Sequence, residues 1–255
     1  MRAGVDSGDD DATVEKEAPF QLSTGKYTPA AAVHAVFANQ FPIGPYSGLL
    51  TPFVTRNLPQ VLTAAGLRVL FEFVAEFTTT GWRFGFNSLG AAASVNHLHF
   101  QFFHLDPASQ GSLPVERISQ SAVRRPRHGT QLWTLRHDWP LRGLVYRGLD
   151  PQSSSQLIGQ CAAYLRKKGL PHTLLVAADR AYLFPRKPLD VPPQFGGGKP
   201  GLLECSGEYI MATLDQFASA GGEEVRAYLA ENVTVGPRDF AAIVEECASF
   251  FPPAG

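Results

Sequence analysis

The stretch from Phe84 to Phe103, FGFNSLGAAASVNHLHFQFF, constrains the fold of this chain more than any other. It begins with alternating residues, passes through a run of small ones, and ends with two histidines and a glutamine at every second position. Side chains at i, i+2 and i+4 of a β-strand lie on the same face. We therefore expect His97, His99 and Gln101 to project together from a strand whose other side chains face the core.

Residues 88–94, between the two predicted strands, are nearly all small. Small residues let a backbone approach a phosphate closely and offer N–H donors to it. The polar side chains in and around this loop are Asn87, Ser88, Ser94 and Asn96. The arrangement favours a nucleophile that faces an anion site.

The two histidines allow other interpretations. They could be metal ligands, a satisfied pair in the core, or a nucleophile with its helper. A zinc site needs three or four protein ligands, and the nearby His104 has the opposite strand parity from His99. We therefore expect no metal and no other cofactor, and nucleophilic phosphoryl chemistry leads on residue types.

Composition excludes several classes of protein. A formal net charge of −1 over 255 residues argues against a nucleic-acid binder, because such proteins carry a basic excess. No apolar run is long enough to cross a bilayer, and there is no secretion signal, so we expect no membrane contact. Three widely spaced cysteines indicate neither disulfides nor a zinc site, which predicts a reduced, cytoplasmic protein.

Residues 1–17, with an acidic cluster, are expected to form a flexible tail. Residues 18–255 are expected to form a single catalytic domain with two unequal halves, about 18–106 and 107–255. A weak internal repeat supports these halves, because strands flank a helix in each of them.

The first half is expected to contain a helix or strand over 29–36, a buried strand over 48–52 and a helix from Leu58 to Phe77 with Asn57 as its N-cap. Two strands, 82–87 and 95–105, follow it. The arginine-containing segment from there to Arg127 is expected to be a solvated loop, part of which could close over an anionic ligand.

The second half is expected to contain strands over 132–139 and 141–148 and a helix to about Lys168, capped within Ser153–Ser155. A hairpin over 172–188 and a pair or triplet of helices over 208–251 complete it. The GGGK run at 196–199 is expected to be a plain loop, since the Walker pattern requires Ser or Thr where Pro200 stands.

The run NSLGAAASVNHLHFQ resembles the active-site motif of the histidine-triad superfamily, in the branch of galactose-1-phosphate uridylyltransferases and, closer still, GDP-hexose phosphorylases. The resemblance extends over PIGPYSGLLTP and the following LPQ, and covers roughly residues 39–105. It implies an α+β, histidine-triad-like fold, with antiparallel sheets flanked by helices.

By motif position, the resemblance makes His99 the nucleophile that attacks the α-phosphorus of a nucleoside diphosphate sugar. A covalent nucleotidyl-histidine forms, hexose 1-phosphate leaves, and inorganic phosphate then releases the nucleoside diphosphate. A fixed acceptor, typically a backbone carbonyl in this superfamily, would hold the other ring nitrogen. Gln101, Asn87 and Ser94 would donate hydrogen bonds to the phosphate, and His97 would orient the site or protonate the leaving oxygen.

Other features bear on the substrate. Asn39, Arg186 and Lys187 are further candidate substrate-binding residues, although a solvated surface pair is an equal alternative for the last two. Ser47 and Glu208 stand where related proteins often carry histidine, which affects recognition of the sugar or acceptor.

Three functions follow from the resemblance. The preferred one is phosphorolysis of a GDP-hexose, with guanine chosen through the family likeness. A hydrolase or transferase that uses another base or acceptor is the first alternative, and a non-catalytic nucleotide-binding module is the second. A homodimer is a further expectation.

Overall fold

The computed structural model describes residues 33–40, 42, 46–77, 81–105, 111–126, 128–177, 179–188, 192–193 and 199–252. The predicted acidic tail lies outside the described residues, as do residues 29–32 of the first predicted element and residues 196–198 of the GGGK run.

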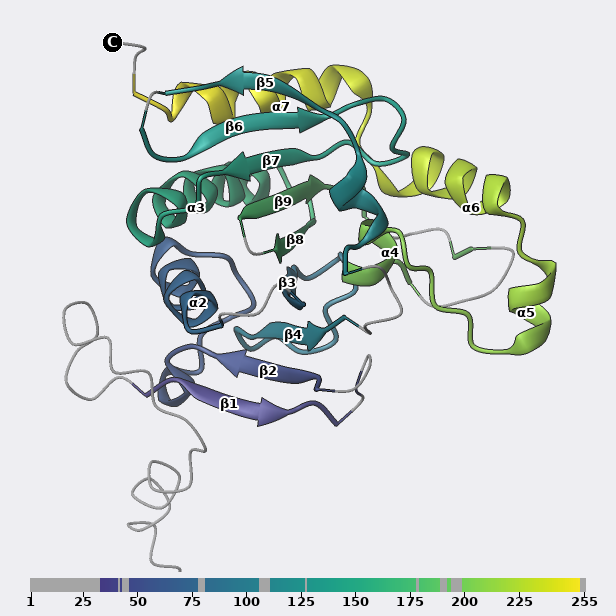
Figure 1. Cartoon of the computed structure of the whole chain (residues 1–255), viewed down its shortest axis with the longest axis horizontal. Helices are drawn as coiled ribbons and strands as arrows, with labels where there is room; N and C mark the ends of the chain where they lie inside the picture. Colours follow the sequence, from purple (N-terminus) through teal and green to yellow (C-terminus); the bar gives the residue numbers. More distant parts are fainter. Residues whose placement is uncertain are drawn as a thin grey trace, which may run out of the picture.

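A nine-stranded sheet, in which every pairing is antiparallel, runs through the molecule (Figure 1). Its order is β1-β2-β4-β3-β8-β9-β7-β6-β5. The strands are β1 Ala35–Ala38, β2 Gly48–Thr51, β3 Trp82–Asn87, β4 Phe100–His104, β5 Gln120–Arg124, β6 Gln131–Leu135, β7 Leu144–Arg147, β8 His172–Ala177 and β9 Arg180–Pro185. The pairing of β3 with β8 joins strands from the two halves of the sequence.

Helices cover both faces of the sheet. The helices are η1 Val54–Arg56, α2 Ala64–Ala75, η3 Pro114–Arg117, α3 Pro151–Lys167, α4 Leu202–Ser206, α5 Leu214–Ser219, α6 Gly222–Tyr228, the π-turn η4 Leu229–Val233 and α7 Pro237–Ser249. One hydrophobic cluster joins the sheet to α2, α3 and α7, and the other joins it to η3, α4 and the end of α6 (Figure 1). In β4, β6, β7, β8 and β9, side chains of opposite parity enter the two clusters, as strand geometry requires.

Two helix starts differ from expectation. The long helix of the first half begins at Ala64, where Thr63 Oγ1 accepts the Gly66 N–H at 3.2 Å. The predicted cap, Asn57, has a left-handed conformation and ends η1 instead. The helix of the second half begins at Pro151, because the carboxylate of Asp150 accepts the Ser153 N–H at 2.6 Å.

The expectation of a strand over 95–105 was wrong in its first half. Strand β4 begins only at Phe100, so His97 and His99 lie in the segment that leads into it and only Gln101 is in the strand. The expectation that the alternate side chains face the core is confirmed, since Leu98, Phe100 and Phe102 are buried. The N–H of Leu98 donates to the Leu58 carbonyl at 2.7 Å instead of joining a strand ladder.

The segment expected to be a solvated loop after β4 is partly structured. Within it, η3 and β5 are formed, and β5 pairs with β6 at the edge of the sheet. Glu116 of η3 forms two hydrogen bonds with Arg83 of β3, Nε–Oε1 at 2.5 Å and Nη2–Oε2 at 2.8 Å. This bidentate pair explains why the segment is ordered.

The remaining strands of the second half lie close to their expected positions, including the β8–β9 hairpin. No described helix has the length and apolar character of a membrane span.

Candidate active site

The candidate residues meet at one end of the sheet. Asn87 ends β3, and its register partner Thr173 lies near the start of β8. His99 directly precedes β4, and Arg186 directly follows β9. Because the strands are antiparallel, these four positions fall at the same sheet end, and their parity places them on the face that α4 covers.

The side chain of Gln60 connects the segments of this site. Its Oε1 accepts the N–H of His99 at 2.9 Å, and its Nε2 donates to the carbonyls of Asn87 at 3.0 Å and His99 at 3.3 Å. Its own N–H donates to Asn96 Oδ1 at 3.0 Å. Gln60 is only 2% exposed, so these bonds compete little with water and hold both backbone polar groups of His99.

In the ring of His99, one nitrogen has a hydrogen-bond partner and the other is left for a ligand. Its Nδ1 lies 2.8 Å from the carbonyl oxygen of His97. A carbonyl only accepts hydrogen bonds, so Nδ1 carries the proton in the neutral ring and Nε2 keeps its lone pair. The backbone of His97 therefore supplies the acceptor that a nucleophilic histidine needs.

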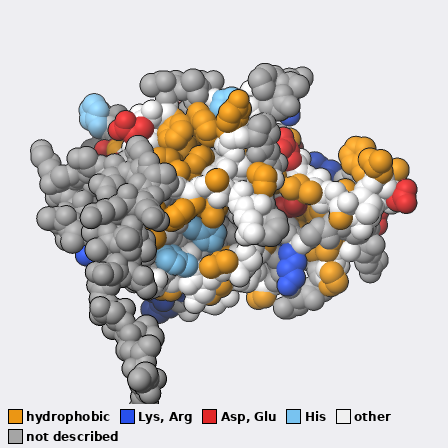
Figure 2. All heavy atoms as spheres, turned by 90° about the horizontal axis from the view of Figure 1, so that it is seen from below, with side chains coloured by type: hydrophobic (Ala, Val, Ile, Leu, Met, Phe, Trp, Pro, Cys, Tyr) orange, Lys and Arg blue, Asp and Glu red, His pale blue; other side chains and the backbone are white. Residues whose placement is uncertain are grey.

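The side chain of His97 makes a different contribution. Its Nε2 is buried and has no hydrogen-bond partner among the described residues. The rings of His97 and His99 are both half-buried, whereas Ser94 and Asn96 are exposed. Histidine side chains, in pale blue, are visible at the surface in Figure 2. The loop therefore presents polar groups to solvent beside the two histidines.

The loop between β3 and β4 has a tightly folded backbone. Ala92 has a φ of 72°, a left-handed conformation that few residues other than glycine adopt, and Gly90 has a φ of 78°. Ala91 is fully buried between them, and its N–H donates to the Ser88 carbonyl at 2.9 Å. Ala92 lies beside the start of α4, where a Cβ on Gly201 would be 3.6 Å from that of Ala92, an ordinary contact distance.

A chain of hydrogen bonds joins this loop to Arg186. Thr173 Oγ1 donates to Asn87 Oδ1 at 2.9 Å and accepts from Arg186 Nη1 at 3.0 Å. Arg186 Nη1 also lies 3.5 Å from the carbonyl of Ala91. Asn87, Thr173 and Arg186 thus form a connected polar group across β3, β8 and the end of β9.

Arg186 is fully buried, yet its Nε and Nη2 have no hydrogen-bond partner among the described residues. Leaving such donors unpaired is costly, because a buried charge needs a counter-charge or acceptors. Burial raises the pKa of Glu204 in α4, whereas backbone hydrogen bonds and the charge of Arg186 act to lower it. An anion within reach of Arg186 would complete its hydrogen bonds.

Ser88 has a structural position. Its Oγ donates to the Leu89 carbonyl at 3.1 Å and accepts the His172 N–H at 2.9 Å, so it ties the loop to the start of β8. His172 is stacked on Phe86, and burial lowers its pKa to about 4, which keeps the ring neutral. Ser88 therefore has little capacity left for a phosphate.

Several candidates are not drawn into the cluster. Lys187 is exposed, and its Nζ donates to the Glu231 carbonyl at 2.6 Å, toward the C-terminal helices. Asn39 follows β1, and its N–H donates to the Ser47 carbonyl at 3.3 Å. Glu208 is exposed after α4.

The prediction assigned no role to Gln60 or Thr173. The LPQ run at 58–60 was the available signal for Gln60, because it belongs to the resemblance. Thr173 gave no signal, since its role depends on the pairing of β3 with β8, two strands distant in sequence. Among the described residues, no group of three or more His, Cys, Asp or Glu side chains is arranged to hold a metal ion.

Comparison with known families places this chain. Residues 12–103 match the model described as GDPGP1-like, N-terminal domain, and residues 114–252 match GDPGP1-like, C-terminal domain. The chain belongs to the GDPGP1-like family. The family resemblance inferred from the motif is thereby confirmed.

Curated relatives of this family member are named as phosphorylases. It is 26% identical over 236 residues to GDP-L-galactose phosphorylase 2 of Arabidopsis thaliana, covering 88% of this chain and 52% of that protein. It is 36% identical over 132 residues to GDP-D-glucose phosphorylase 1 of Homo sapiens, covering 50% of this chain and 32% of that protein. The chain spans about half the length of the first curated relatives it matches.

Solved structures share the fold. Yeast Ap4A phosphorylase Apa2 aligns with a TM-score of 0.59 at 12% identity, covering 80% of this chain and 74% of that one. A DUF4931 family protein from Bacillus cereus ATCC 10987 aligns with a TM-score of 0.50 at 12% identity, covering 88% and 97%. The expected α+β architecture, an antiparallel sheet flanked by helices, is confirmed.

Proposed function

We propose that this protein is a nucleotidyltransferase that cleaves a GDP-hexose by phosphorolysis through a guanylyl intermediate on His99. The observation that carries the proposal is the His97 carbonyl 2.8 Å from His99 Nδ1, which leaves Nε2 as the free nucleophile. Membership of the GDPGP1-like family and the names of the relatives support the substrate class.

In the first step, His99 Nε2 attacks the α-phosphorus and forms a P–N bond. The bond from that phosphorus to the bridging oxygen breaks, and hexose 1-phosphate leaves with the electron pair. In the second step, an oxygen of inorganic phosphate attacks the same phosphorus and the P–N bond breaks. GDP is released, and the neutral imidazole is restored.

Hydrogen-bond donors around the loop stabilise the charge that develops on the non-bridging oxygens. We assign this role to Gln101, Asn87, Ser94 and the loop amides. We assign to the His97 ring the orientation of the leaving group or the protonation of its oxygen, which its unpartnered Nε2 among the described residues supports. Asn96 contributes indirectly, since its Oδ1 binds the Gln60 N–H.

Substitution of His99 tests the mechanism. His99→Gln should abolish turnover and the covalent nucleotide adduct, which intact-protein mass spectrometry detects after incubation with GDP-hexoses. His104→Gln is the matched control, because His104 lies at the opposite end of β4 beside Trp82. An active His99→Gln protein would refute the nucleophile.

Product analysis separates the alternatives. With phosphate present, phosphorolysis yields GDP, whereas a hydrolase yields GMP whether or not phosphate is added. A non-catalytic module would bind nucleotide and form no adduct. Other nucleoside diphosphate sugars in the same assay test whether guanine is the preferred base.

We further propose that Arg186, and not its neighbour Lys187, binds a phosphate group of the substrate. The unpaired Nε and Nη2 of Arg186 support this role, while Lys187 is directed to Glu231. Arg186→Gln should therefore lower kcat/KM by roughly 10-fold or more, the value of one or more charge-assisted hydrogen bonds. An equal effect of Lys187→Gln would contradict this assignment.

A cytoplasmic location and a homodimer stay predictions from the sequence. Fractionation of cells and sedimentation of the purified protein would check them.

A further inference from the structure

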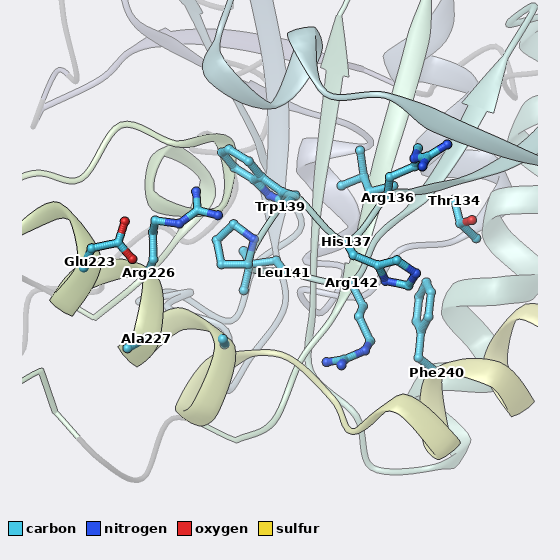
Figure 3. A pocket seen from close by; sticks show the side chains of 13 residues that line it. Thr134, Arg136, His137, Trp139, Leu141, Arg142, Glu223, Arg226, Ala227 and Phe240 are labelled. Atoms are coloured by element: carbon cyan, nitrogen blue, oxygen red, sulfur yellow. The ribbon is translucent and has the colours of Figure 1, made fainter.

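A hollow of about 500 Å³ lies where the turn between β6 and β7 meets α6 and the start of α7. Its wall includes Arg136, His137 and Arg142 from the turn and Arg226 from α6, together with Trp139 and Phe240 (Figure 3). None of these side chains has a role in the proposed reaction.

The hollow is separate from His99. The turn from β6 to β7 is at the same end of the sheet as the candidate active site, because Leu144 at the start of β7 pairs with Leu183 near the end of β9. Strands β3, β8 and β9 lie between β4 and β7. Four strand spacings amount to roughly 19 Å, which is too far for a group at the hollow to touch His99.

The arginines of the hollow form no ion pair among the described residues. Arg142 Nη1 donates to the Val235 carbonyl at 2.9 Å, and Arg226 Nη2 donates to the Asp138 carbonyl at 3.0 Å. Among the described residues, neither of them nor Arg136 forms an ion pair with a carboxylate. Each guanidinium carries five donors, so donors remain for a ligand.

This concentration of positive charge does not follow from composition. The whole chain has a formal net charge of −1, and the wall of the hollow has one carboxylate, Glu223, beside three arginines. An anion that enters the hollow is attracted by each of these positive charges. Guanidinium groups match phosphate oxygens in geometry as well as in charge.

We propose that this hollow binds a phosphate monoester of a small metabolite. The arginines would hold the phosphate, and Trp139, Leu141 and Phe240 would contact the rest of the molecule. A volume of about 500 Å³ suits a ligand of the size of a sugar phosphate or a mononucleotide. The site is additional to the nucleotide-sugar site at His99 and does not require the proposed reaction.

The hollow also has a covalent and hydrogen-bonded path to the candidate active site. The N–H of Arg142 donates to Thr234 Oγ1 at 2.9 Å, and Thr234 forms a β-bridge with Arg186.

Nuclear magnetic resonance of the indole N–H groups tests the proposal on the full chain. The protein has three tryptophans, and Trp139→Phe identifies the signal of the one at the hollow. Titrations at constant ionic strength would use inorganic phosphate, glucose 1-phosphate and GMP as probes. We expect a saturable shift of the Trp139 signal with a monoester, and smaller changes at Trp82 and Trp133.

Substitutions locate the binding. The double variant Arg142→Gln, Arg226→Gln should raise the apparent Kd measured at Trp139 by 10-fold or more. The control variant Arg56→Gln, Lys167→Gln removes the same charge from exposed positions elsewhere and should leave this apparent Kd unchanged. If loss of the Arg142 bond to Val235 prevents folding, Arg136→Gln with Arg226→Gln tests the two exposed arginines instead.

Three results would overturn the proposal: no saturable shift with any probe, a shift that survives the arginine substitutions, or an equal loss in the charge control. Because the readout is binding at Trp139, it is independent of His99. A chain that failed to form a guanylyl adduct could still bind the monoester here.

Discussion

At the scale of single residues, Gln60 is a positioning residue for His99. A buried glutamine that both accepts from and donates to the same backbone residue fixes that residue in place. Displacement of a reacting group by about 1 Å can cost roughly 100-fold in rate. The geometry of the site therefore depends on a side chain outside the histidine motif.

Gln60→Glu separates positioning from general stability. The carboxylate keeps an acceptor for the His99 N–H but faces two carbonyl oxygens that previously received hydrogen bonds. Turnover at pH 7.5 should fall roughly 10- to 100-fold, and the ratio to wild type should recover as the pH falls, because the protonated acid regains a donor.

The measurement is the pH profile of kcat beside the fraction of protein that forms the adduct. Gln160→Glu, exposed on α3, adds the same charge and should keep the wild-type profile. A pH-independent loss of activity in Gln60→Glu would mean that Gln60 acts only through folding.

At the scale of elements, the Arg83–Glu116 pair fastens η3 to the central strand β3. Arg83 is 3% exposed, so the partner carboxylate compensates a charge that water hardly reaches. Removing one member of a buried pair leaves the other unpaired and costs about 3–5 kcal/mol, whereas replacing both with apolar residues is often close to neutral.

Arg83→Met should therefore lower the free energy of unfolding by about 3 kcal/mol or more, and Arg83→Met with Glu116→Leu should recover most of it. Urea unfolding of both variants and of Glu116→Leu completes the cycle. Additive losses in the double variant would show that the two side chains are not coupled.

The elements also show what could be predicted from the sequence. Apolar periodicity placed most strands and both long helices, because alternating and helical patterns record which face is buried. The first residues of the helices were predicted wrongly where a single capping side chain, such as Thr63, determines where the helix begins. The strand assignment of His97 and His99 was wrong because Gln60 competes with the strand ladder for the His99 backbone, and a long-range contact of this kind leaves no periodic pattern.

In the candidate site, too, features contiguous in sequence could be predicted and features that depend on strand pairing could not. The histidines and the small-residue loop were visible because they are contiguous in sequence. The burial of Arg186 and the bridging position of Thr173 were not, since both depend on the pairing of β3, β8 and β9.

At the scale of the whole molecule, we propose that residues 18–255 unfold as one unit. The β3–β8 pairing lies inside the sheet, and Phe84 and Phe86 of β3 share a buried cluster with Leu174 and Val176 of β8. Separating the halves would expose this cluster. We expect one calorimetric transition whose van't Hoff and calorimetric enthalpies agree. Two resolved transitions would show that the halves are independent domains.

The hydrogen bonds from Asn87 through Thr173 to Arg186 cross the same β3–β8 pairing. His99 comes from one half and Arg186 from the other, so neither half contains the whole of the candidate site. A chain divided between Leu105 and Gly111 should thus behave as a complementation pair: each fragment alone is inert, and catalysis reports their reassembly.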